Sequence, residues 1–285
     1  MIFKKNKKYS SEIPSFKMGV KKDEFDEHDY NFRAIMEEIE LPSSVDLRPY
    51  LPSVFSQNQQ GSCTANAGVG AIEYLYNVQQ NKKLILSRQF LYNQERINDG
   101  VELTEDNGSS MRQICKTLKK NGCCEEDLFT YGNGNEIKIP PNEAYINAEN
   151  YKITDYYRCD NLYEAKVALY KKLPVLLGID VYDEFYYPDK KGFIPKINLN
   201  NQSRGGHAIL LVGYFTVKTL CGIKTYYIIR NSWGQSIKNE KSWGYAFNNP
   251  SDSGFGDNGY AYIEENNLKS IILDMWATTG VESID

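Results

Sequence analysis

Cys63 is the residue of this chain best placed for nucleophilic chemistry. A turn rich in glutamine and glycine, residues 56–62, leads directly into a segment of helical periodicity whose first residue is Cys63. The unpaired N–H groups and the positive dipole end of a helix start favour the thiolate, which is the form of cysteine that attacks carbonyl groups. A buried free cysteine that only fills the core is the structural alternative.

A base for this thiol must come from one of two histidines, His28 and His207. His28 lies in an acidic stretch, which is more typical of a solvated surface. His207 follows a loop that ends in two glycines, and it opens the apolar run 208–215. This arrangement predicts an imidazole held at the edge of a strand, beside a flexible loop. Taken alone, His207 is also compatible with an ordinary core position.

A third polar group, Asn231, ends the apolar run 226–230 and is followed by Ser-Trp-Gly. An amide at this place can accept a hydrogen bond from one imidazole nitrogen. That bond holds the tautomer in which the other nitrogen takes the thiol proton. We expect Trp233 to cover the bond from water. A turn that merely ends a strand is the alternative.

Two kinds of periodicity divide the chain into parts that would position these groups. Residues 1–43 are polar and charge-rich and predict an N-terminal arm, a possible short pro-segment. Residues 44–150 have helical periodicity and would form a lobe that carries the nucleophile. Residues 151–285 are mainly strand-like and would carry His207 and Asn231. Separate helical and strand-rich halves predict an α+β protein with a cleft between two lobes.

Capping residues indicate where the helices begin. Ser87 can cap one helix, Ser109 or Ser110 can cap the next, and Asn161 with Glu164 has the spacing of a capping box. The strand-like runs are residues 174–181, 208–215, 226–230 and 260–263.

Together these motifs resemble the papain family of cysteine proteases. Gln57, followed six residues later by Cys63, resembles the family's oxyanion-hole glutamine and nucleophile. The Gly-His-Ala around His207 resembles its base strand, and the Asn-Ser-Trp-Gly from Asn231 resembles its orienting asparagine motif. The separation between thiol and base, 207 − 63 = 144 residues, agrees with the family's spacing.

The resemblance implies a papain-like fold, with a helical left lobe, an antiparallel β-barrel-like right lobe and the active site between them. It assigns a catalytic set of Cys63, His207, Asn231 and Gln57. It also assigns substrate-binding positions to Gly108, Ser109, Gly206 and Trp233. No metal or organic cofactor is implied.

Departures from the common family pattern are also informative. Thr64 follows the nucleophile, as in a Ser-Cys-Thr-Ala variant of the family, and Ser109 replaces the second glycine of the substrate-binding wall. Both cysteines of one familiar disulfide are absent, because Gln60 and Asp106 occupy their positions. With no readable signal peptide, this absence predicts an intracellular protein in a reducing compartment whose six cysteines are mostly reduced.

The bulk composition limits the partners. The chain has 285 residues, a formal net charge of −4 and a pI near 5.5, which argues against binding to nucleic acid or anionic membranes. No run approaches the ~20 apolar residues of a membrane span. We expect a monomer that acts on peptides or proteins.

The function expected from these features is a cysteine endopeptidase working through a thioester acyl-enzyme. One alternative is a catalytically silent papain-fold binding protein, and another is a thiol acyltransferase using the same triad. The arm is shorter than a typical propeptide of the family and lacks a long helical pattern, which argues against an ordinary zymogen. We still expect that the arm can lie over the cleft. A loop at residues 235–255, longer than usual for the family, is expected at the rim.

Overall fold

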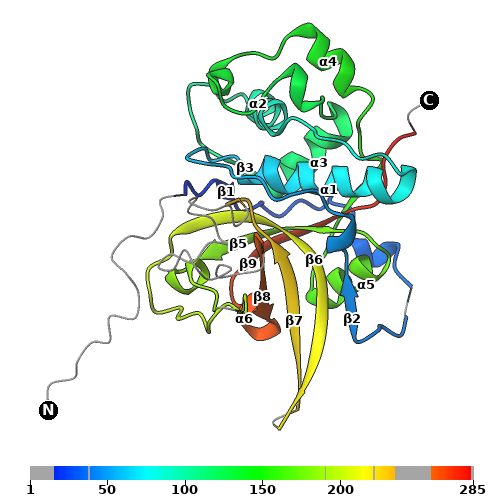
Figure 1. The fold of residues 1–285 in the computed structure, drawn as a ribbon, viewed down its shortest axis with the longest axis vertical. Coiled ribbons are helices and arrows are strands. Elements are labelled where there is room, and N and C mark those ends of the chain that lie inside the picture. The colour runs from blue at the N-terminus through cyan, green and yellow to red at the C-terminus, as the bar shows by residue number, and fades with distance from the viewer. Residues whose placement is uncertain (1–15, 38, 190, 221, 235–257, 284–285) are drawn as a thin grey trace, which may run out of the picture.

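The computed structural model describes residues 16–37, 39–189, 191–220, 222–234 and 258–283. Helices α1–α4 gather on one side of the molecule, and the large sheet with α5 and α6 forms the other side (Figure 1). This arrangement confirms the predicted α+β class. The loop predicted at residues 235–255 lies outside the described residues.

The helices are α1 (Cys63–Gln80), α2 (Arg88–Asn98), α3 (Met111–Lys120), α4 (Asn142–Ala148), α5 (Leu162–Tyr170) and α6 (Glu265–Lys269). Three of them start at side chains named from the sequence. Ser87 accepts a hydrogen bond from the Phe90 N–H at 2.9 Å, and Ser110 and Asn161 cap α3 and α5 in the same way. The helical pattern near residues 32–39 forms only a 3-10 turn, Phe32–Ala34.

The central helix α1 is buried from Cys63 through Tyr76. It ends at Asn81, which adopts a left-handed conformation with a φ of 54°. The helix packs between the other helices and the sheet. None of the helices in the described part of the chain is both long and apolar enough to cross a membrane.

The large sheet contains β4 (Tyr156–Arg158), β9 (Ile272–Thr278), β5 (Val175–Val181), β6 (Gly205–Thr219), β7 (Gly222–Arg230) and β8 (Tyr260–Glu264), in this spatial order. All these pairs are antiparallel, and β2 (Ser44–Asp46) adds to β6. Among the described strands no pairing joins β4 to β8, so closure into a barrel stays a prediction.

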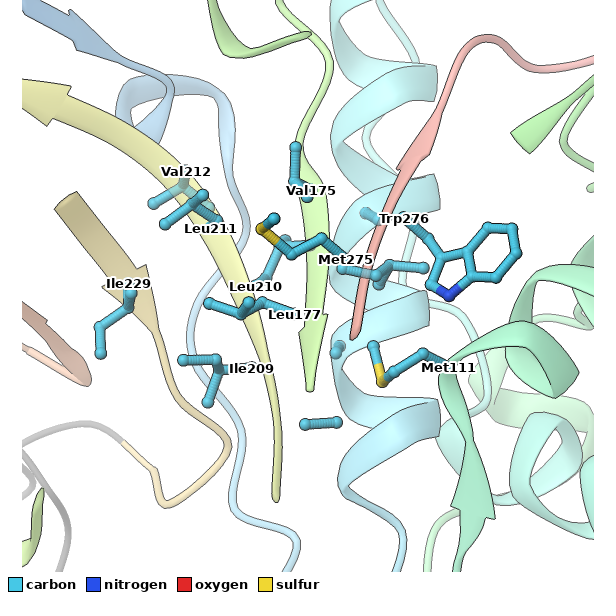
Figure 2. Packing of buried hydrophobic residues seen from close by; sticks show 14 of the residues in the cluster. Met111, Val175, Leu177, Ile209, Leu210, Leu211, Val212, Ile229, Met275 and Trp276 are labelled. Atoms are coloured by element: carbon cyan, nitrogen blue, oxygen red, sulfur yellow. The ribbon is translucent and has the colours of Figure 1, made fainter. Parts of the chain in front are cut away.

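Apolar side chains of neighbouring strands form the core of this sheet. Leu177 of β5, Leu210 of β6 and Met275 of β9 are buried in one cluster, in which they meet residues of α1 and α3 (Figure 2). The four strand-like runs predicted from the sequence correspond to β5, β6, β7 and β8. The strands β4 and β9 were not predicted. They complete the sheet because Ala277 pairs with Tyr157 on one side and with Val175 on the other.

The described part of the N-terminal arm packs on the rest of the protein. Its β1 (Val20–Lys21) pairs in parallel with β3 (Ser109–Ser110), so that Val20 lies opposite Ser109. Figure 1 shows β1 and β3 between the helices and the large sheet. Farther along, the Phe32 side chain is fully buried. The arm therefore runs along the junction of the two halves.

Candidate active site

Cys63 is the first residue of α1, as predicted, and it is fully buried. The loop before it is held at several points. The Gln57 N–H donates to the Ser232 carbonyl at 2.8 Å, and the Tyr131 hydroxyl donates to the Gln57 carbonyl at 2.8 Å. The Tyr131 hydroxyl also hydrogen-bonds the Ser62 hydroxyl. These contacts position the backbone that leads into the nucleophile.

His207 lies on β6 with its imidazole hydrogen-bonded to Asn231, which follows β7. The distance from His207 Nε2 to Asn231 Oδ1 is 2.7 Å. Because an amide oxygen only accepts, the proton of the neutral ring must be on Nε2. The other nitrogen, Nδ1, then carries a lone pair, and it has no hydrogen-bond partner among the described residues. The imidazole has the tautomer that a general base needs.

Aromatic rings cover the bond between His207 and Asn231. The Trp233 ring stacks on the imidazole at a centroid distance of 5.0 Å, and the Tyr186 ring stacks on Trp233 at 5.1 Å. The Phe185 ring meets the imidazole edge-on at 6.4 Å. His207 is fully buried and Asn231 almost so. Water is excluded from the bond, as expected from the position of Trp233 in the sequence.

The thiol of Cys63 lies beside the strand that carries His207. Burial raises the pKa of Cys63 to about 11, although backbone N–H groups of Ala208, Gly19 and Thr64 act in the opposite direction. Burial also lowers the pKa of His207 to about 4. In this form of the protein both groups are uncharged at neutral pH. The thiolate expected from the helix start is disfavoured here because desolvation outweighs the hydrogen bonds from these backbone N–H groups.

Hydrogen bonds hold both ends of the Gln57 side-chain amide. Its Oε1 accepts from the Ser232 hydroxyl at 2.6 Å, which fixes the orientation of the amide. Its Nε2 donates to the Lys17 carbonyl at 3.0 Å and to the Gln60 carbonyl at 2.9 Å. A peptide carbonyl of the arm is therefore bound by the amide that the family resemblance assigns to the oxyanion hole.

All four predicted substrate-binding residues meet the arm. The Ser109 N–H donates to the Gly19 carbonyl at 2.8 Å, and Trp233 stacks on Phe16 at a centroid distance of 4.7 Å. A Cβ atom at Gly108 would lie 1.8 Å from the Gly19 oxygen, and one at Gly206 would lie 2.2 Å from the Val20 oxygen. These two positions must be glycine for the arm backbone to approach so closely.

Charged groups fasten the arm on both sides of β1. Before the strand, the Lys17 ammonium lies 2.8 Å from the Asp106 carboxylate. After the strand, the buried Asp23 carboxylate accepts from the Arg112 N–H and the Trp276 indole N–H, each at 3.0 Å. The expectation that the arm can lie over the site agrees with these contacts.

Sequence reasoning did not identify three polar side chains around Cys63. Tyr131 supports residues 57–62, the loop before Cys63 that we call the oxyanion loop after its expected role, and no sequence signal pointed to Tyr131. Glu95 is fully buried behind the nucleophile, and its carboxyl accepts from the Thr64 hydroxyl at 2.6 Å. Asp106 was noted only as the replacement of a family cysteine. In the structure its carboxylate binds the Gly61 N–H, so a hydrogen bond links the two segments that a disulfide often joins.

The five cysteines among the described residues, Cys63, Cys115, Cys123, Cys124 and Cys159, are free and buried. Cys221 lies outside the described residues. No disulfide therefore joins the described cysteines.

Comparisons with known proteins agree with this geometry. A family model described as papain family cysteine protease matches residues 41–278. An uncharacterized peptidase C1-like protein of Acanthamoeba polyphaga mimivirus is 31% identical over 240 residues, which are 80% of this chain and 70% of that protein. The viral cathepsin of a Cydia pomonella granulosis virus is 32% identical over 201 residues, which are 68% of this chain and 54% of the cathepsin.

A solved structure extends the likeness to the fold. Xylellain, a cysteine protease from Xylella fastidiosa, superposes with a TM-score of 0.74 at 28% sequence identity. The match covers 93% of this chain and 96% of xylellain. The chain spans about half the length of the viral cathepsin but nearly all of xylellain.

Proposed function

The chain belongs to the papain family of cysteine proteases, and we propose that it is an endopeptidase that uses Cys63, His207, Asn231 and Gln57. A peptidase activity follows from the family. The cleavage of internal peptide bonds and the roles of these residues are our proposal. The observation that carries it is the Lys17 carbonyl, a peptide group held by Gln57 Nε2 at 3.0 Å beside the nucleophile loop.

The first chemical step is attack on a peptide carbonyl. His207 Nδ1 takes the thiol proton, and the Cys63 sulfur forms a bond to the carbonyl carbon. The carbonyl oxygen gains the negative charge, which Gln57 Nε2 and the Cys63 N–H stabilise. Each such donor is worth about 3 kcal/mol of the barrier. Asn231 holds the imidazolium by its bond to Nε2.

Collapse of this intermediate breaks the peptide C–N bond. His207 gives its proton to the departing amine, and a thioester to Cys63 remains. Water, deprotonated by the neutral imidazole, then attacks the thioester, and the thiol is regenerated as the carboxylic acid leaves. Water is the only reactant consumed besides the peptide.

The arm is proposed to keep the protein inactive. Residues 16–20 fill the space between the wall of Gly108 and Ser109 and the strand that carries His207. The arm also runs opposite to the direction proposed for a substrate. In a substrate, the residues before the attacked carbonyl bind this wall, whereas in the arm Gly19 and Val20 follow the Lys17 carbonyl. The reversed chain covers the thiol without presenting a bond for cleavage.

Hydrolysis of an internally quenched peptide under reducing conditions tests the endopeptidase proposal. The assay compares the chain with Gly19→Ala, which is designed to expel the arm, and mass spectrometry identifies the cleaved bond. We expect cleavage at an interior bond and loss of it in Gly19→Ala combined with Cys63→Ala. If the Gly19→Ala variant does not hydrolyse the peptide although its Cys63 can be alkylated, the proposal is contradicted and a binding protein is favoured. Transfer of the acyl group to an added amine in preference to water would favour an acyltransferase.

We also propose a reducing, intracellular environment. The unpaired state of the five described cysteines supports it. So does the replacement of a disulfide by the hydrogen bond from Gly61 to Asp106.

A further inference from the structure

Lys17 is held by the protein at both ends. Its carbonyl oxygen accepts from Gln57 Nε2 at 3.0 Å, and its ammonium lies 2.8 Å from Asp106 Oδ2. The same residue therefore binds the proposed oxyanion hole and a carboxylate.

Asp106 is also held by contacts that do not involve Lys17. Its carboxylate accepts from the Gly61 N–H at 3.0 Å and 3.1 Å and from the Tyr92 hydroxyl. Partial burial acts to raise the pKa of Asp106, but the hydrogen bonds from Lys17, Tyr92 and Gly61 prevail and lower it. The side chain is 27% exposed. It is a charged group, held in one orientation and open to solvent on one side.

The position of Asp106 links it to the reacting carbonyl. Gly61, to which it is bonded, lies two residues before Cys63, and Gly108 of the substrate wall lies two residues after Asp106. Asp106 thus stands where the oxyanion loop meets that wall. Because a substrate runs opposite to the arm, the Cα atom of the attacked residue lies on the side of the carbonyl that faces the Gly108 wall, and Asp106 stands beside that wall. The Lys17 side chain reaches Asp106 from the other side of the carbonyl, so we expect a lysine side chain of a substrate to reach it as well.

We propose that Asp106 selects substrates with lysine or arginine at the residue whose carbonyl is attacked, and that Lys17 of the arm occupies this cation site. The proposal rests on the proposed function. When the arm leaves, the carboxylate loses the ammonium and can pair with the same group of a substrate. Charge-assisted hydrogen bonds of this kind recognise Lys and Arg over an uncharged chain of equal length.

Two matched reagents test this on the full chain. One is acetyl-Val-Lys chloromethyl ketone, and the other carries norleucine, which lacks only the ammonium. Each alkylates Cys63 with loss of chloride, and intact-mass measurements follow the labelling rate. Because the arm competes equally with both reagents, the ratio of the two second-order rate constants is independent of how often the arm opens. We expect labelling by the lysine reagent to be about tenfold faster.

Variants separate recognition from structural support. Asp106→Asn should bring the ratio near one, whereas Asp106→Glu should keep the preference for lysine. Glu102→Gln removes an exposed carboxylate of the same loop and should leave the ratio unchanged. Equal labelling of the wild-type chain by both reagents would overturn the proposal while leaving the endopeptidase function intact.

Two other outcomes are also decisive. A slower reaction of Asp106→Asn with both reagents at an unchanged ratio would show that Asp106 only supports the loop, and would overturn selection. If neither reagent labels Cys63 even in Gly19→Ala, the proposed function fails, and the selection of lysine fails with it.

Discussion

The imidazole of His207 has its Nε2 proton committed to Asn231, so only Nδ1 can act as a base. This bond is 2.7 Å long and lies beneath the Trp233 ring. Removal of the imidazole and removal of the amide are therefore expected to have different consequences. Loss of the imidazole removes the base, whereas loss of the amide leaves a base of uncertain orientation.

We predict that Asn231→Ala lowers kcat/KM roughly 100-fold, and that His207→Ala lowers it by more than about 10⁴-fold. Both variants are made in the Gly19→Ala background, and peptide hydrolysis is measured by fluorescence. Thermal unfolding is the control for correct folding. Equal losses in the two variants would contradict an orienting role for Asn231.

Tyr131 makes a second prediction at this scale. Tyr131→Phe removes the hydroxyl that bonds the Gln57 carbonyl and the Ser62 hydroxyl, so the oxyanion loop loses two restraints. We expect kcat to fall about tenfold with little change in KM, because substrate contacts stay while the donor geometry loosens. Steady-state kinetics in the Gly19→Ala background measures both constants. A rise in KM alone would assign Tyr131 to substrate binding instead.

The arm is the element that determines whether the site is accessible. Its backbone pairs with β3 and passes so close to the nucleophile loop that a Cβ at residue 19 would lie 2.2 Å from the Gly61 oxygen. The backbone oxygen of Gly61 has little freedom to move, since its own N–H is bound to Asp106. Because the fit is so tight, we expect a single methyl group added at Gly19 to displace the arm.

We predict that Gly19→Ala raises the rate of Cys63 alkylation by iodoacetamide near pH 6 by at least about tenfold. With the arm in place, burial holds the pKa of Cys63 at about 11 and that of His207 at about 4, so thiolate is scarce. Exposure of the pair allows it to ionise. Peptide mapping locates the label.

Lys22→Ala is the matched control, because Lys22 is exposed on the same arm. It should leave the alkylation rate unchanged. If iodoacetamide alkylates Cys63 equally slowly in the Gly19→Ala and Lys22→Ala variants, the arm does not limit access to the thiol.

At the scale of the whole molecule, buried carboxyl groups make stability depend on pH. Burial raises the pKa of Glu73 to about 7 and that of Glu95 to about 8. In the unfolded chain both titrate near their ordinary values, so above about pH 6.5 the folded protein binds more protons than the unfolded one. Stability therefore falls as the pH rises through these folded pKa values. His207 has the opposite effect on stability, but only below about pH 6.5. There the unfolded chain binds a proton on this imidazole that the folded protein does not bind, so stability decreases as the pH falls.

We predict that the free energy of unfolding decreases by about 2 kcal/mol between about pH 6.5 and pH 8.5. Urea titrations at the two pH values measure it. The double variant Glu73→Gln and Glu95→Gln should show a clearly smaller change, since an amide has no proton to lose in this range. A wild-type chain that is equally stable at both values would refute the raised pKa values.

Local sequence determined much of what was predicted correctly. The helix starts at Cys63 and after Ser87 depend on residues a few positions apart, and the four strands were recognisable from short apolar runs. The family could also be recognised from the sequence, because each of its motifs is a short contiguous stretch. The roles of Cys63, His207 and Asn231 stay a proposal, although the predicted bond between the last two is present.

Only the tertiary structure decided the state of the site. The pKa of Cys63 is raised by burial and lowered in part by a backbone hydrogen bond from Gly19, which is 44 positions away in the sequence (63 − 19 = 44) and whose contact no local pattern encodes. The pairing of Asp106 with Gly61 and Lys17 likewise joins three distant segments. Local propensity describes one segment at a time. Burial and electrostatic interactions depend on every segment that folding brings together.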